Sequence, residues 1–119
     1  MTVTVKRGEI WRACVPYNED PANGKERFVV VLGASPQGRE EDEVVLVAPI
    51  TSFGDGGRCR NGDVPILNWR NVTGLNKASW IRARRVWGAN PNALVGSSPA
   101  GSVETGTMDQ VLATIAEFF

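Results

Sequence analysis

The sequence predicts a single domain of the α+β class, mainly β, in which one C-terminal helix packs on a strongly bent antiparallel sheet. The chain has 119 residues, which is enough for one hydrophobic core. Most of its apolar residues fall in short β-branched or alternating runs that turn-forming residues separate. Apolar residues follow helical spacing at the C-terminal end. Because the sequence shows neither repeats nor a low-complexity linker, we expect one domain over residues 1–119.

The first half of the chain contains three predicted strands. Residues 9–15 alternate loosely, and residues 27–33 form the continuous β-branched run typical of a buried central strand. Residues 16–24 are polar and turn-rich, which predicts a loop between these two strands. Residues 44–50 predict a third apolar strand, which ends in the sequence Pro-Ile-Thr-Ser.

The second half is less regular until its end. Residues 53–62 contain four glycines and no aliphatic side chain, which predicts a flexible loop. Residues 64–69 predict a short strand, and Pro65 within it indicates a sheet edge. Residues 79–87 predict a strand with basic residues on at least one face, and residues 93–95 interrupt an otherwise loop-like stretch.

The C-terminal segment predicts one amphipathic helix. Thr107 and Gln110 fit a capping box, in which a hydroxyl at the helix start is followed three residues later by a carboxamide. The apolar residues of this segment fall on one helical face, which we expect to pack in the core without a cofactor role: Met108, Val111, Leu112, Ile115, Phe118 and Phe119.

Composition excludes several classes of site. The chain has no histidine, which excludes Ser-His-Asp and Cys-His nucleophile systems and histidine zinc sites. Two cysteines, Cys14 and Cys59, are too few for a cysteine-only zinc site and are expected to be reduced and inert. The longest apolar runs, residues 28–32 and 44–50, are too short to span a membrane. We therefore expect a soluble cytoplasmic protein that needs no cofactor or metal and has no membrane association.

Charge is balanced overall but unevenly placed. Lysine plus arginine and aspartate plus glutamate number 13 each. Residues 58–85 hold seven basic and one acidic side chain, a net charge of +6, whereas the segments on either side are each at −3. A local basic field is enough to bind a polyanion such as a nucleic acid. The alternative is that these arginines decorate the solvent face of strands.

Four fragments of the sequence, together with the terminal helix, resemble the MazF/PemK family of toxin–antitoxin ribonucleases. The family opens with an R-G-[DE]-[IV]-[WY] strand, here K-R-G-E-I-W at residues 6–11. Its second strand matches G-K-E-R-F-V-V-V-L at residues 24–32, and the end of its third strand matches P-I-T-S at residues 49–52. Its G-L-x-K-x-S motif matches G-L-N-K-A-S at residues 74–79.

The resemblance implies a small SH3-like barrel or bent sheet with helices that works as a homodimer. Members of the family cleave single-stranded RNA at short sequences without a metal. A cognate antitoxin protein silences them by wrapping across the dimer and blocking the RNA groove.

The resemblance also assigns a site. Arg27 and Thr51 occupy the positions of the family's catalytic arginine and threonine. Metal-free cleavage uses the neighbouring 2′-hydroxyl as nucleophile, and an arginine fork and a hydroxyl suit the charged phosphorus centre. We further expect substrate binding by Lys25, Glu26 and Ser52, which flank this pair, and by Arg82 and Arg84 of the basic segment.

Some positions depart from the family pattern. Phe28 replaces the usual proline after the arginine, and Ala22 stands near the position where many members carry a glutamate. Arg84 stands where some members carry an aspartate. These departures bear on proton transfer and on the RNA sequence that is cleaved, but they leave the arginine–threonine pair in place.

Each residue also has a structural interpretation. Arg27 could pair with Glu26 or Glu19, and Thr51 could bond the backbone of a turn. Trp11 is expected to pack in the core. One of the other three tryptophans could stack on an RNA base, or all three could pack in the core or a dimer interface: Trp69, Trp80 and Trp87.

Three functions remain open at this level. The first is a sequence-specific endoribonuclease toxin. The second is a toxin of the same fold that acts on a protein target such as gyrase, which would make Arg27 and Thr51 dispensable. The third is a catalytically weakened module that binds RNA through residues 58–85 without turnover.

Overall fold

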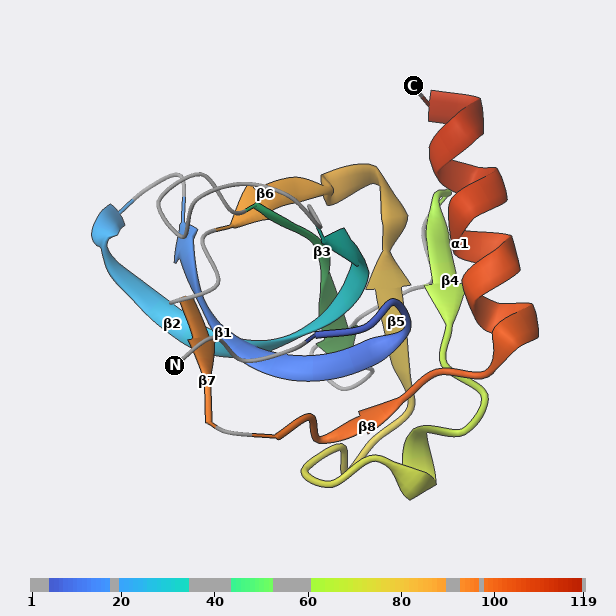
Figure 1. Cartoon of the computed structure of the whole chain (residues 1–119), viewed down its shortest axis with the longest axis horizontal. Coiled ribbons are helices and arrows are strands. Elements are labelled where there is room, and N and C mark those ends of the chain that lie inside the picture. The colour runs from blue at the N-terminus through green and yellow to red at the C-terminus, as the bar shows by residue number, and fades with distance from the viewer. Residues whose placement is uncertain are drawn as a thin grey trace.

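The computed structural model describes residues 5–17, 20–34, 44–52, 61–89, 93–96 and 98–118. Within these ranges, eight strands, two short 3₁₀ helices and one α-helix follow one another (Figure 1). Most of the predicted flexible loop lies outside the described part, namely residues 53–60, which include Cys59. Phe119 also lies outside it. The elements are β1 (Glu9–Tyr17), β2 (Asp20–Ala34), β3 (Val45–Ser52), β4 (Asp63–Pro65), η2 (Trp69–Asn71), β5 (Ser79–Arg82), η3 (Ala83–Arg85), β6 (Trp87–Ala89), β7 (Leu94–Val95), β8 (Gly101–Ser102) and α1 (Thr105–Phe118).

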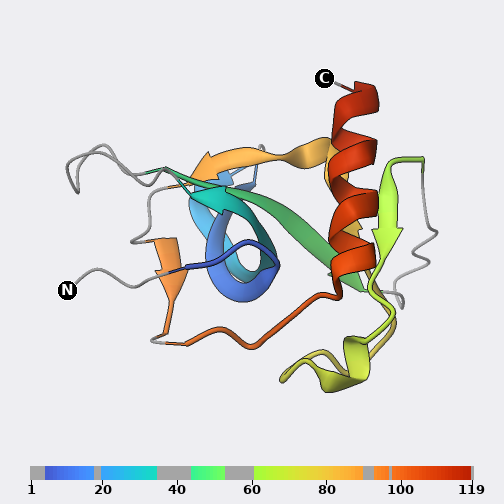
Figure 2. The ribbon, with the colours of Figure 1, turned by 45° about the vertical axis from the view of Figure 1, so that its right-hand side comes forward.

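The strands form one antiparallel sheet that curls strongly without closing. Its order is β4-β5-β3-β2-β1-β7, and β6 pairs with β3 while β8 pairs with β1. Figures 1 and 2 show β1, β2 and β3 coiling together, with α1 standing beside β4 at one end of the sheet. The predicted class, mainly β with a C-terminal helix on a bent sheet, is confirmed. Among the described residues, no helix is long and apolar enough to cross a membrane.

Two layers of core pack on opposite faces of the coiled strands. Alternate residues of β2 divide between them, because side chains of a strand point to its two faces in turn. Core layer 1 includes Val30 and joins the sheet to Met108 and Val111 of α1. Core layer 2 is formed by Trp11, Ala13, Val29, Val31, Val45, Val47 and Ala89.

The K-R-G-E-I-W motif builds the start of β1. Gly8, at a φ of 92°, donates its N–H to the carbonyl of Val31 at 2.8 Å. Arg7 Nε donates to the carbonyl of Leu32, also at 2.8 Å. Glu9 Oε1 accepts from the buried indole of Trp11 at 3.3 Å and from the backbone N–H of Lys6 at 2.7 Å. This motif therefore fixes β1 against β2 and satisfies the polar atom of a core tryptophan.

The G-L-N-K-A-S motif builds the turn into β5. Gly74 has a φ of 93°, and a Cβ on it would lie 2.6 Å from the ring of Phe28. Ser79 is buried, its hydroxyl donates to the carbonyl of Lys77 at 2.9 Å, and its carbonyl accepts from Ile66 at 2.9 Å. The glycine and the serine thus set the point at which β5 begins.

Several element boundaries differ from the predictions. β2 begins at Asp20 rather than at residue 27, because pairing with β1 extends the strand through the polar stretch. The predicted strand over residues 64–69 already ends at Pro65, and Trp69 begins η2. The predicted strand over residues 79–87 is broken by η3, where buried Ala83 donates to the carbonyl of Gly62 at 3.1 Å. α1 begins at Thr105, since Met108 donates to the carbonyl of Glu104 at 3.0 Å, so Thr107 lies inside the helix and is not its cap.

Other local predictions are confirmed. Pro65 lies on β4, which is the terminal strand of the sheet order, so the edge position is correct. The apolar face of α1 packs in core layer 1 through Met108, Val111, Leu112 and Ile115. Phe118 departs from that pattern, because it is 43% exposed.

Candidate functional site

Arg27 and Thr51 lie on neighbouring strands, just beyond the end of the pairing between them. The antiparallel pairing of β2 with β3 includes Val31–Val47 and ends with Val29–Pro49. Arg27 and Thr51 each lie two residues beyond this last pair, and the alternation of side chains places both on the face of Val29. The two residues that the family resemblance selects therefore follow the same end of the pairing and share a face.

Core layer 2 ends beside this pair. Val29 is fully buried in that layer, whereas Arg27, two residues earlier on the same face, is exposed. Thr51 is half-buried. β1 supports Arg27 from the other side, because Arg27 pairs with the buried residue Ala13. A rigid core thus holds a cation and a hydroxyl at its exposed margin, where a polyanion can reach them.

Trp80 and Arg82 extend the same face onto β5. Thr51 pairs with Trp80, and directly opposite side chains of antiparallel strands have Cβ atoms about 4.5–5.5 Å apart. Arg82 lies two residues further along β5, opposite Asp63 of β4. Both side chains are half-buried, while Ser79 and Ile81, on either side of Trp80, are buried. We call Arg27, Thr51, Trp80 and Arg82 the site row.

Arg82 carries a polar group that its surroundings do not satisfy. Its Nε is buried and has no hydrogen-bond partner within the described part of the chain. A buried donor left unpaired costs about 1–3 kcal/mol, so a bound acceptor would be favoured here. A phosphate oxygen is the acceptor that an arginine fork suits best.

The remaining predicted substrate-binding residues are placed unequally. Lys25 and Glu26 lie on β2 next to Arg27, where they pair with Val15 and Cys14 of β1. Ser52 follows Thr51 at the end of β3 and pairs with Ser79. The backbone thus places Lys25 and Glu26 next to Arg27, and Ser52 next to Thr51. The structure does not describe the side chains of these three residues.

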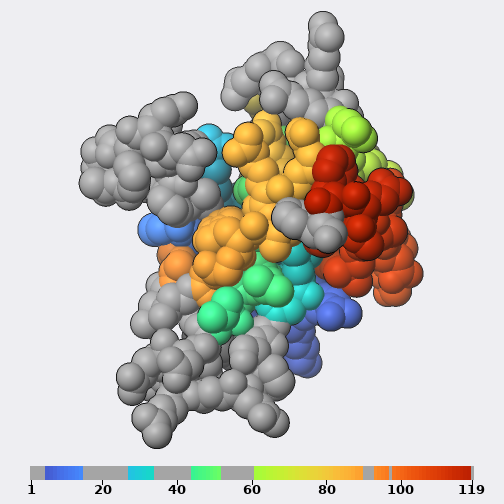
Figure 3. Space-filling model, turned by 90° about the horizontal axis from the view of Figure 1, so that it is seen from above, coloured from blue at the N-terminus to red at the C-terminus, as the bar shows by residue number. Residues whose placement is uncertain are grey.

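Arg84 lies apart from the site row. Its side chain covers Gly62, where a Cβ would lie 2.4 Å from Arg84 Cγ, and its guanidinium is 6.0 Å from the ring centre of Phe118. Figure 3 shows this end of α1 against the segment that carries η3 and β6. Arg84 therefore packs between the turn before β4 and the end of the helix.

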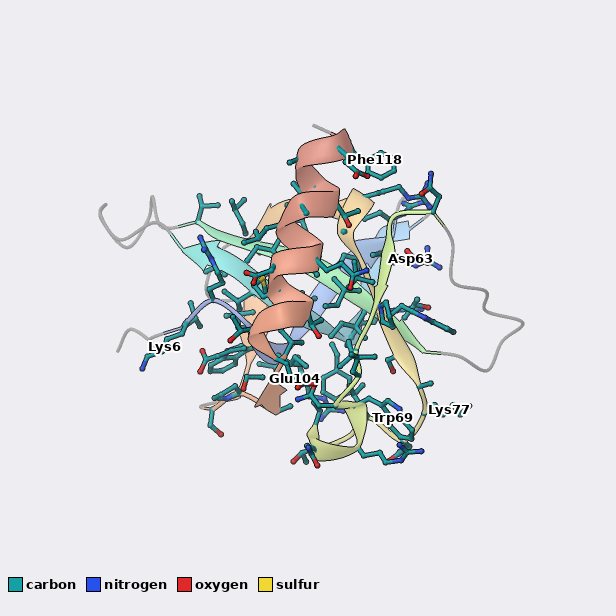
Figure 4. The ribbon with its side chains drawn as sticks, turned by 90° about the vertical axis from the view of Figure 1, so that its right-hand side faces the viewer. Lys6, Asp63, Trp69, Lys77, Glu104 and Phe118 are labelled. Atoms are coloured by element: carbon teal, nitrogen blue, oxygen red, sulfur yellow. The ribbon has the colours of Figure 1, made fainter. Side chains whose placement is uncertain are left out.

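The described residues of the basic segment, from residue 61 onward, do not form one patch. Trp69 and Lys77 lie toward the Glu104 end of α1, and Phe118 lies at the other end (Figure 4). At the Glu104 end, Arg70 stacks on Trp69 with its guanidinium 4.6 Å from the ring centre. Charge counting along the sequence could not show this division, because a fold distributes neighbouring residues over different faces.

Phe28, which replaces the proline usual in the family, does not change the face of the sheet on which Arg27 lies. Phe28 is the next residue on β2, so it points to the opposite face and packs against core layer 1. Its ring lies 5.5 Å from the guanidinium of Arg12 and contacts the backbone position of Gly74. A large ring here fills the space beside a glycine and leaves the site row unchanged.

Sequence reasoning named Trp80 and Arg82 but did not join them to Thr51. Their alternation with Ser79 and Ile81 indicates a shared face. The partner of that face depends on cross-strand register, which no local pattern specifies. Within the described ranges, no group of three cysteine, aspartate or glutamate side chains is arranged to hold a metal ion.

Comparisons with known proteins bear on the family and the fold. Residues 6–119 match the family model described as PemK-like, MazF-like toxin of type II toxin-antitoxin system. The fold is similar to the Mycobacterium tuberculosis toxin MazF-mt6, with a TM-score of 0.63 and 20% identity over 92% of this chain and 95% of that one. It is also similar to an endoribonuclease in complex with its cognate antitoxin from a mycobacterial species, with a TM-score of 0.62 and 15% identity over 97% and 94% of the two chains. A comparison with curated protein sequences gives no match.

Proposed function

Because the chain belongs to the PemK-like, MazF-like toxin family of type II toxin–antitoxin systems, we propose that it is an endoribonuclease that cleaves single-stranded RNA. The observation that supports the proposal is that Arg27 and Thr51 both follow the end of the β2–β3 pairing and share a face at the margin of core layer 2. The proposed reaction is sequence-specific and needs no metal, and its cytoplasmic substrate is messenger RNA.

The proposed chemistry uses the RNA itself as nucleophile. The 2′-oxygen forms a bond to phosphorus and loses its proton, while the bond from phosphorus to the 5′-oxygen breaks and that oxygen takes up a proton. Arg27 stabilises the extra negative charge on the phosphoryl oxygens, which is greatest in the pentavalent transition state. Thr51 donates or accepts a hydrogen bond at a phosphoryl or 2′-oxygen. The products carry 2′,3′-cyclic phosphate and 5′-hydroxyl ends.

Two protein partners belong to the proposal. A cognate antitoxin would silence the enzyme, and support comes from the similar fold of the mycobacterial endoribonuclease in complex with its antitoxin. A second copy of the chain would complete a homodimer. Support for self-association comes from Val44 and Leu46, which are 43% and 46% exposed and lie beside Gly88 of β6. Exposed apolar side chains grouped in this way favour an interface.

The proposed activity is tested by incubating the purified protein with a long unstructured RNA in excess EDTA and identifying the ends of the products. We expect a few discrete fragments with 2′,3′-cyclic phosphate and 5′-hydroxyl ends, because neither Arg27 nor Thr51 needs a metal for its role. Inhibition by EDTA would contradict the metal-independent mechanism. No cleavage by folded, antitoxin-free protein would favour the weakened binder if RNA still binds, and the protein-target toxin if it does not.

A second measurement tests the basic contacts. We expect Arg82→Gln to weaken binding of single-stranded RNA and to reduce the slope of log affinity against log salt by about one phosphate contact. We expect a smaller loss for Arg84→Gln, because that side chain packs on Gly62 and Phe118, apart from the site row. Fluorescence anisotropy over a range of potassium chloride concentrations measures both slopes. A wild-type slope in Arg82→Gln would remove Arg82 from the RNA path.

A further inference from the structure

We infer that the loop of residues 67–78 is a docking surface for an acidic peptide segment with leucine-sized side chains, which the cognate antitoxin would carry. The inference rests on the proposed function. We call residues 67–78 the basic loop. It leaves the sheet where Pro65 of β4 pairs with Trp80 of β5, and Trp80 in turn pairs with Thr51. A segment bound to the basic loop would therefore lie next to the site row.

Hydrogen bonds fix the shape of the basic loop. Its two ends are joined by Ile66, whose N–H donates to the carbonyl of Ser79 at 2.9 Å. Inside the loop, Asn71 N–H donates to the carbonyl of Asn68 at 2.9 Å. Asn68 Nδ2 donates to the carbonyl of Ser102, also at 2.9 Å. Compact surface loops whose ends lie close together are frequently functional, and a loop that is already ordered loses little entropy when a partner binds.

Leu67 gives the basic loop an apolar anchor that the fold leaves in solvent. Its side chain is 73% exposed, the largest exposed fraction among the large apolar residues that the structure describes. The other large apolar residues of the loop, Trp69, Val72 and Leu75, pack in or against core layer 1. One exposed leucine is common on protein surfaces, so the charges beside it indicate which partner it suits.

Two cations accompany Leu67 on the basic loop. Arg70 lies over Trp69 with its guanidinium 4.6 Å from the ring centre, and Lys77 is exposed. Glu104 lies toward the same end of the molecule (Figure 4), and one carboxylate leaves the two cations in excess. Charge complementarity therefore favours a partner with aspartate or glutamate side chains. The whole stretch of residues 64–103 has no acidic residue and five basic ones: Arg70, Lys77, Arg82, Arg84 and Arg85.

The side chains of the basic loop favour a peptide over RNA. Leu67 has no aromatic face on which a base would stack, and the guanidinium of Arg70 covers one face of the Trp69 ring. A peptide can bring carboxylates to Arg70 and Lys77 together with an aliphatic side chain that buries Leu67. RNA brings negative charge but no aliphatic side chain to cover the leucine.

The inference is tested with three fluorescein-labelled peptides of about 12 residues, made of glutamate and leucine, of glutamate and serine, and of lysine and leucine. Fluorescence anisotropy with the purified full chain should show binding of the glutamate–leucine peptide, about tenfold weaker binding of the glutamate–serine peptide and none of the lysine–leucine peptide. Leu67→Ser should weaken binding of the glutamate–leucine peptide about tenfold and leave the glutamate–serine peptide unchanged, because only the apolar contact is lost. Lys77→Gln should weaken binding of both acidic peptides about two- to threefold.

Val95→Ser and Arg85→Gln serve as matched controls. Val95 is a 39% exposed apolar residue on β7, and Arg85 is an exposed cation at the end of η3, so neither belongs to the basic loop. Both variants should bind the glutamate–leucine peptide as the wild type does. Losses in these controls equal to those of the loop variants would overturn the inference, and so would binding of the lysine–leucine peptide.

The other occupants of this surface give distinct results. Weaker binding of an uncleavable 2′-O-methyl RNA by Leu67→Ser would place the basic loop on the RNA path and overturn the inference. A lower mass of this variant in size-exclusion chromatography would assign the loop to a contact between copies and would overturn it as well. If the wild-type protein cleaves RNA but does not bind the glutamate–leucine peptide, the inference alone fails. If it neither cleaves nor binds RNA while the peptide binds through Leu67, the proposed function fails and the docking surface stands.

Discussion

Arg27→Ala is expected to reduce the rate of RNA cleavage by about 100- to 1,000-fold, the usual cost of removing one donor from a transition-state oxyanion. Arg27 is exposed in the middle of β2, and its removal leaves the buried residues of the strand, such as Val29, in place, so the variant should fold normally. The loss should fall on kcat rather than on KM, because the charge that Arg27 stabilises is greatest in the transition state. Single-turnover cleavage of a saturating RNA measures this rate directly.

The neighbouring side chains supply the controls for this result. Arg12→Ala removes an exposed arginine from the adjacent strand, where it stacks on Phe28 on the opposite face, and should leave the cleavage rate unchanged. Thr51→Ala should be impaired, Thr51→Ser should retain more activity, and the double variant with Arg27→Ala should lose less than the sum of both losses. Full activity in both Arg27→Ala and Thr51→Ala would remove this pair from the site.

Trp11→Ala is expected to lower the free energy of unfolding by about 3–5 kcal/mol, a large part of the total stability of a domain of this size. The side chain is 1% exposed, lies in the middle of core layer 2 and bonds Glu9 through its indole. Urea denaturation followed by circular dichroism gives the value. The position of Arg27 should also be disturbed, because Trp11 pairs with Val29, which lies two residues from Arg27.

A second tryptophan provides the comparison for stability. Trp80→Ala should lower the free energy of unfolding by less than Trp11→Ala does, because Trp80 is half-buried whereas Trp11 is 1% exposed. The two variants remove the same side chain, so the difference between them isolates its position. Equal losses for both would contradict the assignment of the larger contribution to the buried tryptophan.

The sequence predicted those parts of the fold that depend on local pattern. The β-branched run of β2 and the apolar face of α1 are strong signals, because burial imposes a period on the residues. The start of β2 at Asp20 and the break at Ala83 were not predictable in this way. In the first case pairing with β1 overrides a turn-rich composition, and in the second a hydrogen bond to Gly62 interrupts an extended run.

The candidate site was predictable in its residue types but not in its arrangement. Motif resemblance selects Arg27 and Thr51, and both follow the end of the pairing of β2 with β3. Trp80 pairs with Thr51 across two strands, whereas Arg84 lies against Phe118 of α1. Both positions depend on contacts between segments that are distant in the sequence. No property of residues 79–87 alone distinguishes these two positions.

The segment that leads into α1 is fastened to β1, so these two parts of the chain should open as one cooperative unit. The carbonyl of Ile10 accepts from Ala100 N–H at 2.7 Å, the carbonyl of Gly8 accepts from Val103 N–H at 2.8 Å, and Met108 and Val111 lie in the core layer that contains Ile10. Opening of either segment removes partners from the other. Amide hydrogen exchange of the Ala100 and Val103 N–H groups should therefore slow or quicken together with that of β1 when stability is changed.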